Sequence, residues 1–526
     1  MQNGDAVINA NLLEHRRYYI AVGVTLASML ELLDITIVNV AMPHMMQAFA
    51  VSYDEVAWIS TAYIVANVVV MPASTWLAEV FGRKRYFLAS LLVFIAASYG
   101  CGQSTGLWSM VAWRVVQGGA GGCILSLSQT IIYDCFPKEE VGKGLAIYGA
   151  GIMLGPILGV TLGGYITELY AWPWIFFINV PLGIATLLIL AWMLPVGATG
   201  QGRRIDLAGF AGMVTGLASL QIVLEQGQRL QWWSSPTICI LSAAALSGMV
   251  LFLSRSFGKD DSVVNLDVLK DGLYAKSLVF SIFLGAAHYS TVFIFPFYLQ
   301  NLLGHSPVET GILMLPVAVA SAVAMAISST LTKDGKEVRA MAAIVTGGIL
   351  FVYAMVLSSH LTLSSSSMEI MLPQALRGFG VGLIFVPLGI LAARNLEPAL
   401  VGHGAALLNL LRQFGGSAGV AVTATVFRQF TDQRFADLGA RANYPLMRQE
   451  PANVVYLPFQ LPSEVDAPAL LLFRQMRRLA SMQAIDAMFL LFGTGMAMGL
   501  FLIIGIPVLA VAGRRLRRAH ANSGGY

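Results

Sequence analysis

The stretch LELLDITIVNVAMP, residues 30–43, places two carboxylates inside an apolar run that extends from Tyr18 to Pro43. This run is typical of a membrane-spanning helix, where a carboxylate near the middle costs roughly 2.5–3.5 kcal/mol on insertion scales. Glu31 and Asp34 are separated by three positions and therefore share one helical face. That face can be directed toward the interior of a helical bundle instead of lipid. We therefore predict a protonation or cation-binding site of a membrane transporter here.

The composition is that of a polytopic membrane protein. Of the 526 residues, 57% are hydrophobic and only 11% are charged, whereas soluble domains have about 25% charged residues. A soluble enzyme is therefore excluded. The net charge of +4 needs no nucleic-acid partner, because Lys and Arg cluster at the ends of apolar segments. No cofactor, metal site or disulfide framework is expected, since no CxxC pair occurs among the four cysteines, Cys101, Cys123, Cys135 and Cys239.

The apolar segments predict an all-α protein with fourteen transmembrane helices, because a bilayer core needs about 20 apolar residues per helix. The expected spans are 17–42, 55–80, 86–103, 107–134, 143–168, 174–196, 206–226, 235–254, 277–302, 308–331, 339–359, 369–393, 403–427 and 485–511. Basic residues gather in alternate loops, as in Arg83-Lys84-Arg85. The positive-inside rule then places both termini in the cytoplasm.

One connection is much longer than the others. Residues 428–484 have mixed charge and, by parity of the spans, lie outside the cell. Two interpretations remain open. The segment is either a flexible loop, or a small docking subdomain for a partner in which part of the chain extends the last helix.

Three stretches in the first half resemble sequence motifs of one family. TWLAEVFGRKR, residues 75–85, resembles motif A of the major facilitator superfamily; Gly82, Arg83 and Lys84 match, while Glu79 replaces the usual Asp. WRVVQGGAGG, residues 113–122, resembles motif B through Arg114. GAGIMLGPILGVTLGGYI, residues 149–166, resembles motif C, the signature of proton-driven exporters, through Gly151, Gly155, Pro156, Gly159 and Gly163. Taken alone, a glycine-rich face indicates only close helix packing.

Two further stretches, LLDITIVNVAMP (residues 32–43) and WPWIFFINVPLG (residues 172–183), complete the resemblance to the fourteen-span EmrB/QacA branch of drug:proton antiporters. The resemblance implies a cytoplasmic N-terminus at 1–16, a six-helix bundle at 17–196, and linker helices at 197–276. A second bundle at 277–511 and a basic cytoplasmic tail at 512–526 follow. It further implies a multi-pass protein of the bacterial inner membrane. Because segment 428–484 is long, the chain looks most like EmrB-type members of tripartite pumps, with an EmrA-like periplasmic adaptor and a TolC-like outer-membrane channel.

The resemblance also implies roles for individual residues. Motif A implies a charge relay that stabilises one end state. Asp34 is expected to carry the proton and Arg114 to modulate its affinity, although Arg114 can instead only hold the bundle together. Glu31 is a second proton site, a contact for cationic substrates, or a residue hydrogen-bonded at a helix interface. LRGFGVGLIFVPLG, residues 376–389, makes Arg377 a counterpart of Arg114.

Several polar and aromatic residues are candidates for the substrate cavity, with packing or lipid contact as the other interpretation. They are Asn67, Gln129, His288, Tyr289, Phe293, Gln374, Arg377 and Gln413. The expected activity is proton-coupled export of small hydrophobic or cationic compounds. Export of one endogenous metabolite, lipid or siderophore, or a role as sensor or scaffold, remains open. The sequence lacks a G-x-x-x-x-G-K-[ST] loop for ATP, so an ion gradient must supply the energy.

Overall fold

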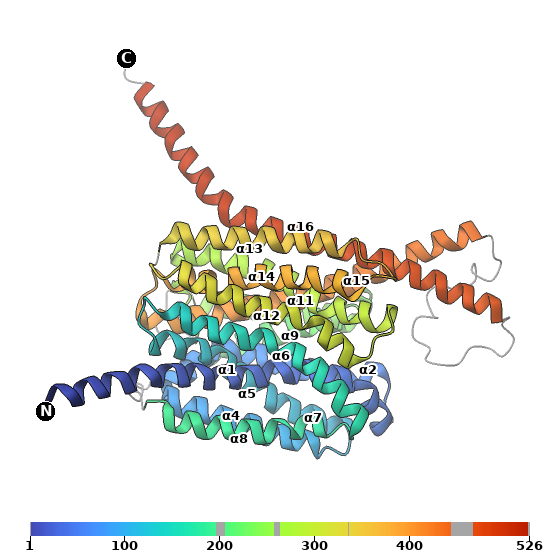
Figure 1. Cartoon of the computed structure of the whole chain (residues 1–526), viewed down its shortest axis with the longest axis horizontal. Coiled ribbons are helices and arrows are strands. Elements are labelled where there is room, and N and C mark those ends of the chain that lie inside the picture. Colours follow the sequence, from blue (N-terminus) through green and yellow to red (C-terminus); the bar gives the residue numbers. More distant parts are fainter. Residues whose placement is uncertain (1, 196–205, 257–262, 335, 443–466, 524–526) are drawn as a thin grey trace.

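The computed structural model describes residues 2–195, 206–256, 263–334, 336–442 and 467–523, which form helices and no strand. Two bundles pack side by side with nearly parallel helices (Figure 1). The N-terminal bundle contains α1 (Gln2–Phe49), α2 (Tyr53–Val56), α3 (Trp58–Phe81), α4 (Arg83–Gly102), α5 (Leu107–Cys135), α6 (Val141–Leu169), α7 (Trp174–Phe177) and α8 (Asn179–Met193).

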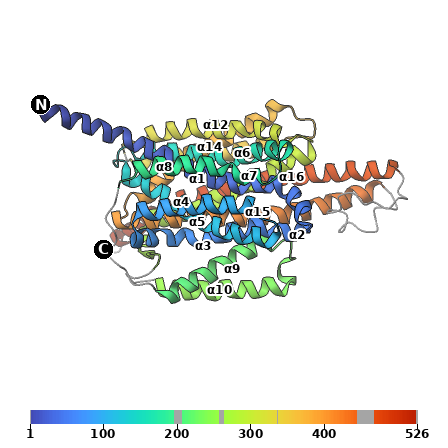
Figure 2. The same cartoon turned by 90° about the horizontal axis from the view of Figure 1, so that it is seen from below.

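The C-terminal bundle follows a pair of peripheral helices. This pair, α9 (Leu207–Gln226) and α10 (Pro236–Ser256), lies at the edge of the molecule in Figure 2. The C-terminal bundle contains α11 (Gly272–Phe297), the π-helix η3 (Tyr298–Leu302), α12 (Pro307–Leu331), α13 (Glu337–Ser358), α14 (Ser367–Ala393), α15 (Pro398–Ala442) and α16 (Ala467–Ser523). Short 3-10 helices, η1 (Trp232–Ser234) and η2 (Leu266–Lys270), border α10 and α11.

Thirteen helical segments of the described chain are long and apolar enough to cross a membrane. They do not include α15, which is long enough at 45 residues but carries Asn409, Arg412 and Gln413 within its apolar sequence. Counted with α15, the segments are arranged as six, two and six. The count of fourteen spans therefore stays a prediction, while the all-helical polytopic fold is confirmed.

Both termini lie at the same end of the bundle in both views (Figures 1 and 2). The starts of α4, α6 and α13 are also at this end and bring Arg83, Lys143 and Lys336 there. We call it the basic end and the opposite end the extension end. Three helices begin at the extension end with capping boxes, in which a Ser and a Glu satisfy each other's backbone N–H groups: Ser52 and Glu55, Ser306 and Glu309, Ser366 and Glu369.

The last two helices project beyond the bundle at the extension end (Figure 1). Phe435 of α15 contacts Phe473 of α16 with ring centroids 5.0 Å apart, and Met476 packs into the same apolar cluster. Arg477 lies 3.8 Å from Asp432 across the two helices. A flexible loop is therefore wrong for residues 428–442 and 467–484, which are helical; positions 443–466 lie outside the described residues.

Helix boundaries differ from the expected spans at both ends of the chain. α1 begins at Gln2 instead of residue 17, and α16 extends from Ala467 to Ser523 instead of 485–511. A count of apolar residues detects only the membrane-length portion of a helix, whereas residues with good helix propensity continue the same hydrogen-bond ladder into water. The expected N-terminal segment 1–16 is accordingly helical from Gln2.

Candidate functional site

Asp34 lies at the centre of a buried polar network in the N-terminal bundle. Its side chain is 0% exposed, and its Oδ2 forms an ion pair with Nη1 of Arg114 from α5. Gln117 Nε2 donates to Oδ1 at 3.1 Å, and Asn179 Nδ2 donates to the same oxygen at 2.9 Å. Three helices, α5, α8 and α1 itself, thus meet at one carboxylate. A buried charge tolerates this environment only when it is paired and hydrogen-bonded.

Arg114 is itself held from several sides. Its Nη1 donates to Gln117 Oε1 at 2.8 Å, and its Nε donates to the carbonyl oxygen of Ile59 at 3.3 Å. The guanidinium carbon lies 4.0 Å from the centre of the Tyr63 ring, a cation–π geometry. Arg114 therefore pairs with Asp34, while the role in proton transfer that the motif B resemblance implies stays a prediction.

Glu31 is buried one turn away with a different set of partners. Asn67 Nδ2 donates to Glu31 Oε1 at 2.7 Å, and the Tyr63 hydroxyl lies 3.4 Å from the same oxygen. Glu31 Oε2 has no hydrogen-bond partner among the described residues. Gly121 of α5 leaves room for this carboxylate, because an added Cβ would lie 3.0 Å from Glu31 Cγ. Tyr63 contacts both Glu31 and Arg114 and so connects the two acids.

Two of these partners, Asn179 and Tyr63, are not among the candidates from the sequence. Asn179 lies within WPWIFFINVPLG, where it was the one amide in an apolar stretch. Its Nδ2 also lies 3.2 Å from Ser98 Oγ of α4, which fixes the amide between two helices. The position of Asn179 as the one amide of an apolar motif is a signal that could have identified it.

The glycine face of motif C packs against the helix that carries both acids. An added Cβ at Gly159 would lie 2.7 Å from the carbonyl oxygen of Leu33, and one at Gly163 would lie 3.3 Å from that of Ile37. Gly151 and Gly155 contact the same side of α1, and Pro156 lies within α6. Only glycine permits this approach of α6 to α1.

Motif A lies at the basic end, between the two bundles. Gly82 has φ +84°, which permits the sharp change of direction from α3 to α4. Arg83 forms an ion pair with Asp134 of α5, and Lys84 Nζ donates to the carbonyl oxygen of Leu194 at 2.6 Å. Glu79 Oε1 lies 3.5 Å from His403 Nε2 of α15 in the other bundle. His403 had no signal in the sequence.

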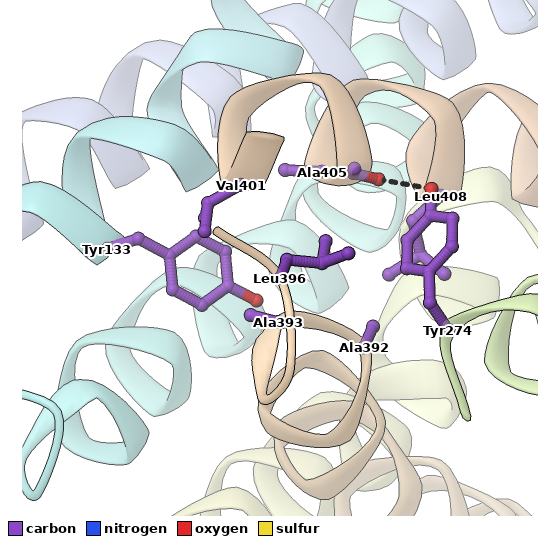
Figure 3. A pocket seen from close by; sticks show the side chains of 9 residues that line it. Tyr133, Tyr274, Ala392, Ala393, Leu396, Val401, Ala405 and Leu408 are labelled. Carbon is purple, nitrogen blue, oxygen red and sulfur yellow. Dashed lines mark hydrogen bonds between the residues drawn. The ribbon is translucent and has the colours of Figure 1, made fainter. Parts of the chain in front are cut away.

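Further polar contacts join the bundles near the basic end. Asn409 Nδ2 of α15 donates to Gln129 Oε1 of α5 at 2.8 Å, and the Tyr133 hydroxyl donates to the carbonyl oxygen of Gly389 at 3.0 Å. Tyr133 also borders a small pocket that is otherwise lined by the C-terminal bundle, including Tyr274 (Figure 3). The Tyr274 hydroxyl donates to Gly404 at 2.9 Å, so the polar groups of this pocket are satisfied internally.

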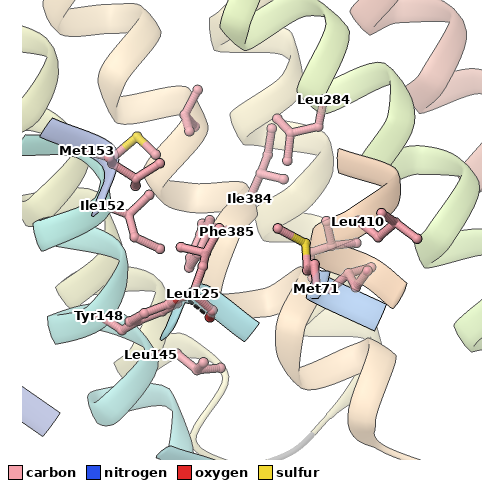
Figure 4. Close-up of a cluster of buried hydrophobic side chains, with 14 of the residues drawn as sticks. Met71, Leu125, Leu145, Tyr148, Ile152, Met153, Leu284, Ile384, Phe385 and Leu410 are labelled. Atoms are coloured by element: carbon pink, nitrogen blue, oxygen red, sulfur yellow. Dashed lines mark hydrogen bonds between the residues drawn. The ribbon is translucent and has the colours of Figure 1, made fainter. Parts of the chain in front are cut away.

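An apolar layer connects the bundles on the side of these contacts that faces the extension end (Figure 4). Tyr148 and Ile152 of α6 face Phe385 and Ile384 of α14, and the Tyr148 and Phe385 ring centroids are 6.4 Å apart. Arg114 lies nearer to the extension end of its helix than this layer does. The structure is therefore packed between the buried acids and the basic end.

The cavity candidates of the C-terminal bundle fall into two groups. His288, Gln374 and Arg377 are buried, at 9%, 1% and 1% exposure. Tyr289 and Gln413 are half-buried, whereas Phe293 is 47% exposed. Phe293 thus lies on an accessible face of α11, which suits lipid contact as well as a cavity.

Two helical bundles around a buried ion pair are the architecture expected of a membrane transporter, and sequence comparison agrees. A family model described as Major Facilitator Superfamily matches residues 24–420. The chain is 30% identical over 430 residues to the multidrug export protein EmrB of Escherichia coli K12, covering 80% of this chain and 82% of that protein. It is 31% identical over 415 residues to the MFS-type transporter YhcA of Bacillus subtilis, covering 79% and 77% respectively.

A solved structure shows the same fold. The crystal structure of the human organic anion transporter MFSD10 (TETRAN) aligns with a TM-score of 0.59 over 93% of this chain and 99% of that one, at 16% identity. At this identity the likeness concerns the fold alone. The chain belongs to the major facilitator superfamily, and it resembles the EmrB-type branch, as expected from its motifs.

Proposed function

We propose that this protein exports hydrophobic and amphiphilic compounds across the bacterial inner membrane by alternating access, driven by an inward flow of protons. The observation that carries the proposal is the fully buried pair of Asp34 and Arg114. The name of the similar EmrB protein, a multidrug exporter, supports the direction of transport and the breadth of substrates.

The pair provides a chemical basis for proton coupling. Arg114 and a proton compete for the same carboxylate of Asp34, since protonation removes the negative charge that the guanidinium neutralises. When Asp34 is protonated, Arg114 loses its counter-charge. It keeps its existing contacts with Gln117, the Ile59 carbonyl and the Tyr63 ring. Tyr63 also reaches Glu31, so a change at Asp34 is transmitted to the second acid.

The glycine face of α6 provides the mechanical link. α6 contacts α1 on one side, and on the other it contacts α12 of the second bundle, where Gly142 lies against Ser329 and Gly164 against Pro307. A displacement of α1 that accompanies proton release therefore presses directly on the interface between the bundles.

The contacts at the basic end are the closed gate of this cycle. Three contacts between the bundles must break when the cavity opens to the basic end. They are Glu79 with His403, Gln129 with Asn409, and Tyr133 with the Gly389 carbonyl. We assign that end to the cytoplasm, in line with the positive-inside rule. Protons then enter from the extension end.

We propose that the extension is the attachment site of a tripartite pump. The helical pair of α15 and α16 rises on the side opposite the cytoplasm and contacts the bundle through Arg478, whose Nε donates to the Leu302 carbonyl at 2.8 Å. An EmrA-like adaptor that binds these helices would connect the transporter to a TolC-like channel in the outer membrane.

The direct test is dye accumulation in inside-out vesicles energised by a pH gradient. Wild type, Asp34→Asn and Glu31→Gln are compared at equal protein level. Accumulation that collapses with the gradient and is lost in Asp34→Asn supports the proposal. Gradient-driven transport that persists in Asp34→Asn contradicts the assigned carrier, and a failure to transport any of several lipophilic dyes favours one dedicated substrate.

A further inference from the structure

Arg377 is a buried cation that the described chain does not neutralise. It lies within α14 at 1% exposure, and none of its three guanidinium nitrogens has a hydrogen-bond partner among the described residues. None of the carboxylates placed by the structure forms an ion pair with it. Taking an ion of this kind out of water costs several kcal/mol after relaxation. A fold that retains such a charge inside a membrane bundle has a use for it.

In the N-terminal bundle the corresponding arginine has a counter-charge, although its Nη2 also lacks a hydrogen-bond partner in the described chain. Arg114, the counterpart of Arg377 in the repeated sequence, has Asp34, Gln117 and the Ile59 carbonyl as partners. Asp34 is supplied by α1, the first helix of that bundle. The first helix of the C-terminal bundle, α11, contains no Asp or Glu between Gly272 and Phe297. The C-terminal bundle therefore repeats the arginine without a carboxylate on its first helix, and Asp486 of α16 forms no ion pair with Arg377 in the described chain.

Two more buried polar side chains, one on α14 and one on α11, have unpaired atoms in the described part of the chain. Gln374, three residues earlier on the same face of α14, is 1% exposed, and neither its amide nitrogen nor its oxygen has a partner in the described part of the chain. His288 of α11 is 9% exposed and its Nδ1 is likewise unpaired. α11, which carries His288, packs against α14, which carries Gln374 and Arg377. We call Arg377, Gln374 and His288 the C-terminal cluster.

The charges of the two bundles are complementary. Glu31 and Asp34 belong to the N-terminal bundle, whereas the C-terminal bundle provides Arg377 and Arg412. Arg412 donates to Asn409 and stacks its guanidinium 5.0 Å from the centre of the Phe385 ring, and it forms no ion pair with a described carboxylate. The C-terminal side of the interface is thus electropositive, and it repels lipophilic cations while it attracts anions.

We propose that the C-terminal cluster binds the acid group of an amphiphilic organic anion. A guanidinium presents a planar fork that matches a carboxylate in two parallel hydrogen bonds, and the Gln374 amide and the His288 imidazole complete the polar shell. The apolar part of the ligand rests on the layer toward the basic end, where Leu284 lies one turn from His288 and Ile384 two turns from Arg377 (Figure 4). This inference names a substrate class and rests on the proposed export function.

The test is equilibrium binding to the full-length protein in nanodiscs of neutral phosphatidylcholine. The probe is 11-(dansylamino)undecanoic acid, and its carboxamide is the matched neutral ligand with the same fluorophore and chain. We expect wild type to bind the acid about tenfold more tightly than the amide, as loss of one charged hydrogen bond implies. Arg377→Gln is expected to abolish this preference while it leaves the affinity for the amide unchanged, and Arg377→Lys is expected to retain part of it.

A matched control separates the site from general surface charge. Arg339 is an exposed arginine at the basic end that pairs with Asp334, and Arg339→Gln is expected to bind both ligands as wild type does. Equal affinities of wild type for acid and amide overturn the inference, as does a preference that survives Arg377→Gln. A melting temperature that responds to chloride in place of gluconate, without any acid preference, identifies an inorganic anion instead and also overturns it. If Arg377→Gln does not fold, the wild-type comparison and Arg377→Lys still decide.

The same measurement distinguishes this inference from the proposed function. Binding needs no gradient, so Asp34→Asn is expected to keep the acid preference. An acid preference in a protein that shows no gradient-driven transport would leave the cluster intact and reject the proton coupling. Gradient-driven transport without an acid preference would leave the proton coupling intact and reject the acid-binding role of the cluster.

Discussion

Two buried arginines of the described chain, Arg114 and Arg377, have opposite environments. Arg114 neutralises Asp34 of α1 and donates to the Ile59 carbonyl of α3, whereas Arg377 has no hydrogen-bond partner among the described residues. The first arrangement stabilises the folded bundle as a pair, because either charge alone would be left in a low-dielectric interior. The second arrangement lowers stability in the absence of a ligand. The two sites therefore respond differently to the same substitution.

Arg114→Gln is expected to destabilise the protein by about 3–5 kcal/mol, since it leaves the Asp34 carboxylate buried without a counter-charge. Thermal unfolding in detergent at neutral pH measures this change. The double variant Asp34→Asn/Arg114→Gln should recover much of the loss, because it removes both charges together. Effects of the two single substitutions that simply add up would contradict the pairing.

Arg377→Gln is expected to raise the melting temperature measured without added anions. The substitution removes a desolvated charge and breaks no hydrogen bond of the described chain. Arg114→Gln, which lowers the melting temperature, serves as the matched comparison. A clear drop in the melting temperature of Arg377→Gln would mean that the guanidinium has a partner within the protein.

At this scale the sequence predicted the charges but not their partners. Glu31, Asp34 and Arg114 are conspicuous because a charge in an apolar run is costly. Tyr63 and His403 are not, since their side chains are ordinary in membrane helices, and Asn179 is conspicuous only as the one amide of an apolar stretch. Which residue faces which carboxylate depends on how the helices pack, and that information is absent from local sequence patterns.

The α6 helix is the element that joins α1, which carries Glu31 and Asp34, to the interface between the bundles. Its glycine face allows the backbone of α1 to approach, and its opposite face contacts α12. Side chains larger than glycine would force α1 away and move Glu31 and Asp34 relative to Arg114. The spacing of the glycines therefore determines the geometry of the ion pair.

Gly159→Ala is expected to reduce transport strongly and to destabilise the bundle by about 1–3 kcal/mol, as overpacking generally does. Its added Cβ would press on the Leu33 carbonyl and on the Thr36 side chain of α1. Gly495→Ala in α16 is the matched control, because a Cβ there meets no atom within 4 Å. Transport assays and melting curves on both variants measure the difference; equal behaviour of the two would contradict the role of the glycine face.

Element boundaries were predicted well inside the membrane and poorly outside it. The apolar runs identified the cores of α3, α5, α12 and α14, because burial in lipid requires about 20 apolar residues. The helical portions of segment 428–484 contain many charged residues and lack that signature. They are stabilised by contacts between α15 and α16, such as that of Phe435 with Phe473, which a single-helix pattern does not reveal.

The whole molecule is held closed at the basic end. Polar contacts and an apolar layer join the two bundles there, and α6 packs along α12. The sequence predicted the two bundles through a family resemblance, but it contained no information on which end is closed. That property depends on contacts between residues hundreds of positions apart.

A crosslink across the closed end is expected to stop transport. Gly402 of α15 lies against Thr75 of α3, with an added Cβ 3.0 Å from the Thr75 methyl carbon, which is close enough for a disulfide. Thr75→Cys/Gly402→Cys is oxidised in a chain whose Cys135 and Cys239 are replaced by serine. Dye transport should be lost on oxidation and regained with a reductant, while each single cysteine variant is insensitive. Undiminished transport by the crosslinked protein would show that the basic end need not open.

The central claim is that Asp34 carries the proton that drives export, and proton movement measured with a trapped pH-sensitive dye in proteoliposomes tests it most directly. A substrate gradient imposed on wild type, and on the control Asp334→Asn at an exposed carboxylate, should move protons in the opposite direction. Asp34→Asn should bind substrate and move no protons. Proton movement at the wild-type rate in Asp34→Asn, or substrate movement without protons in wild type, would contradict the account.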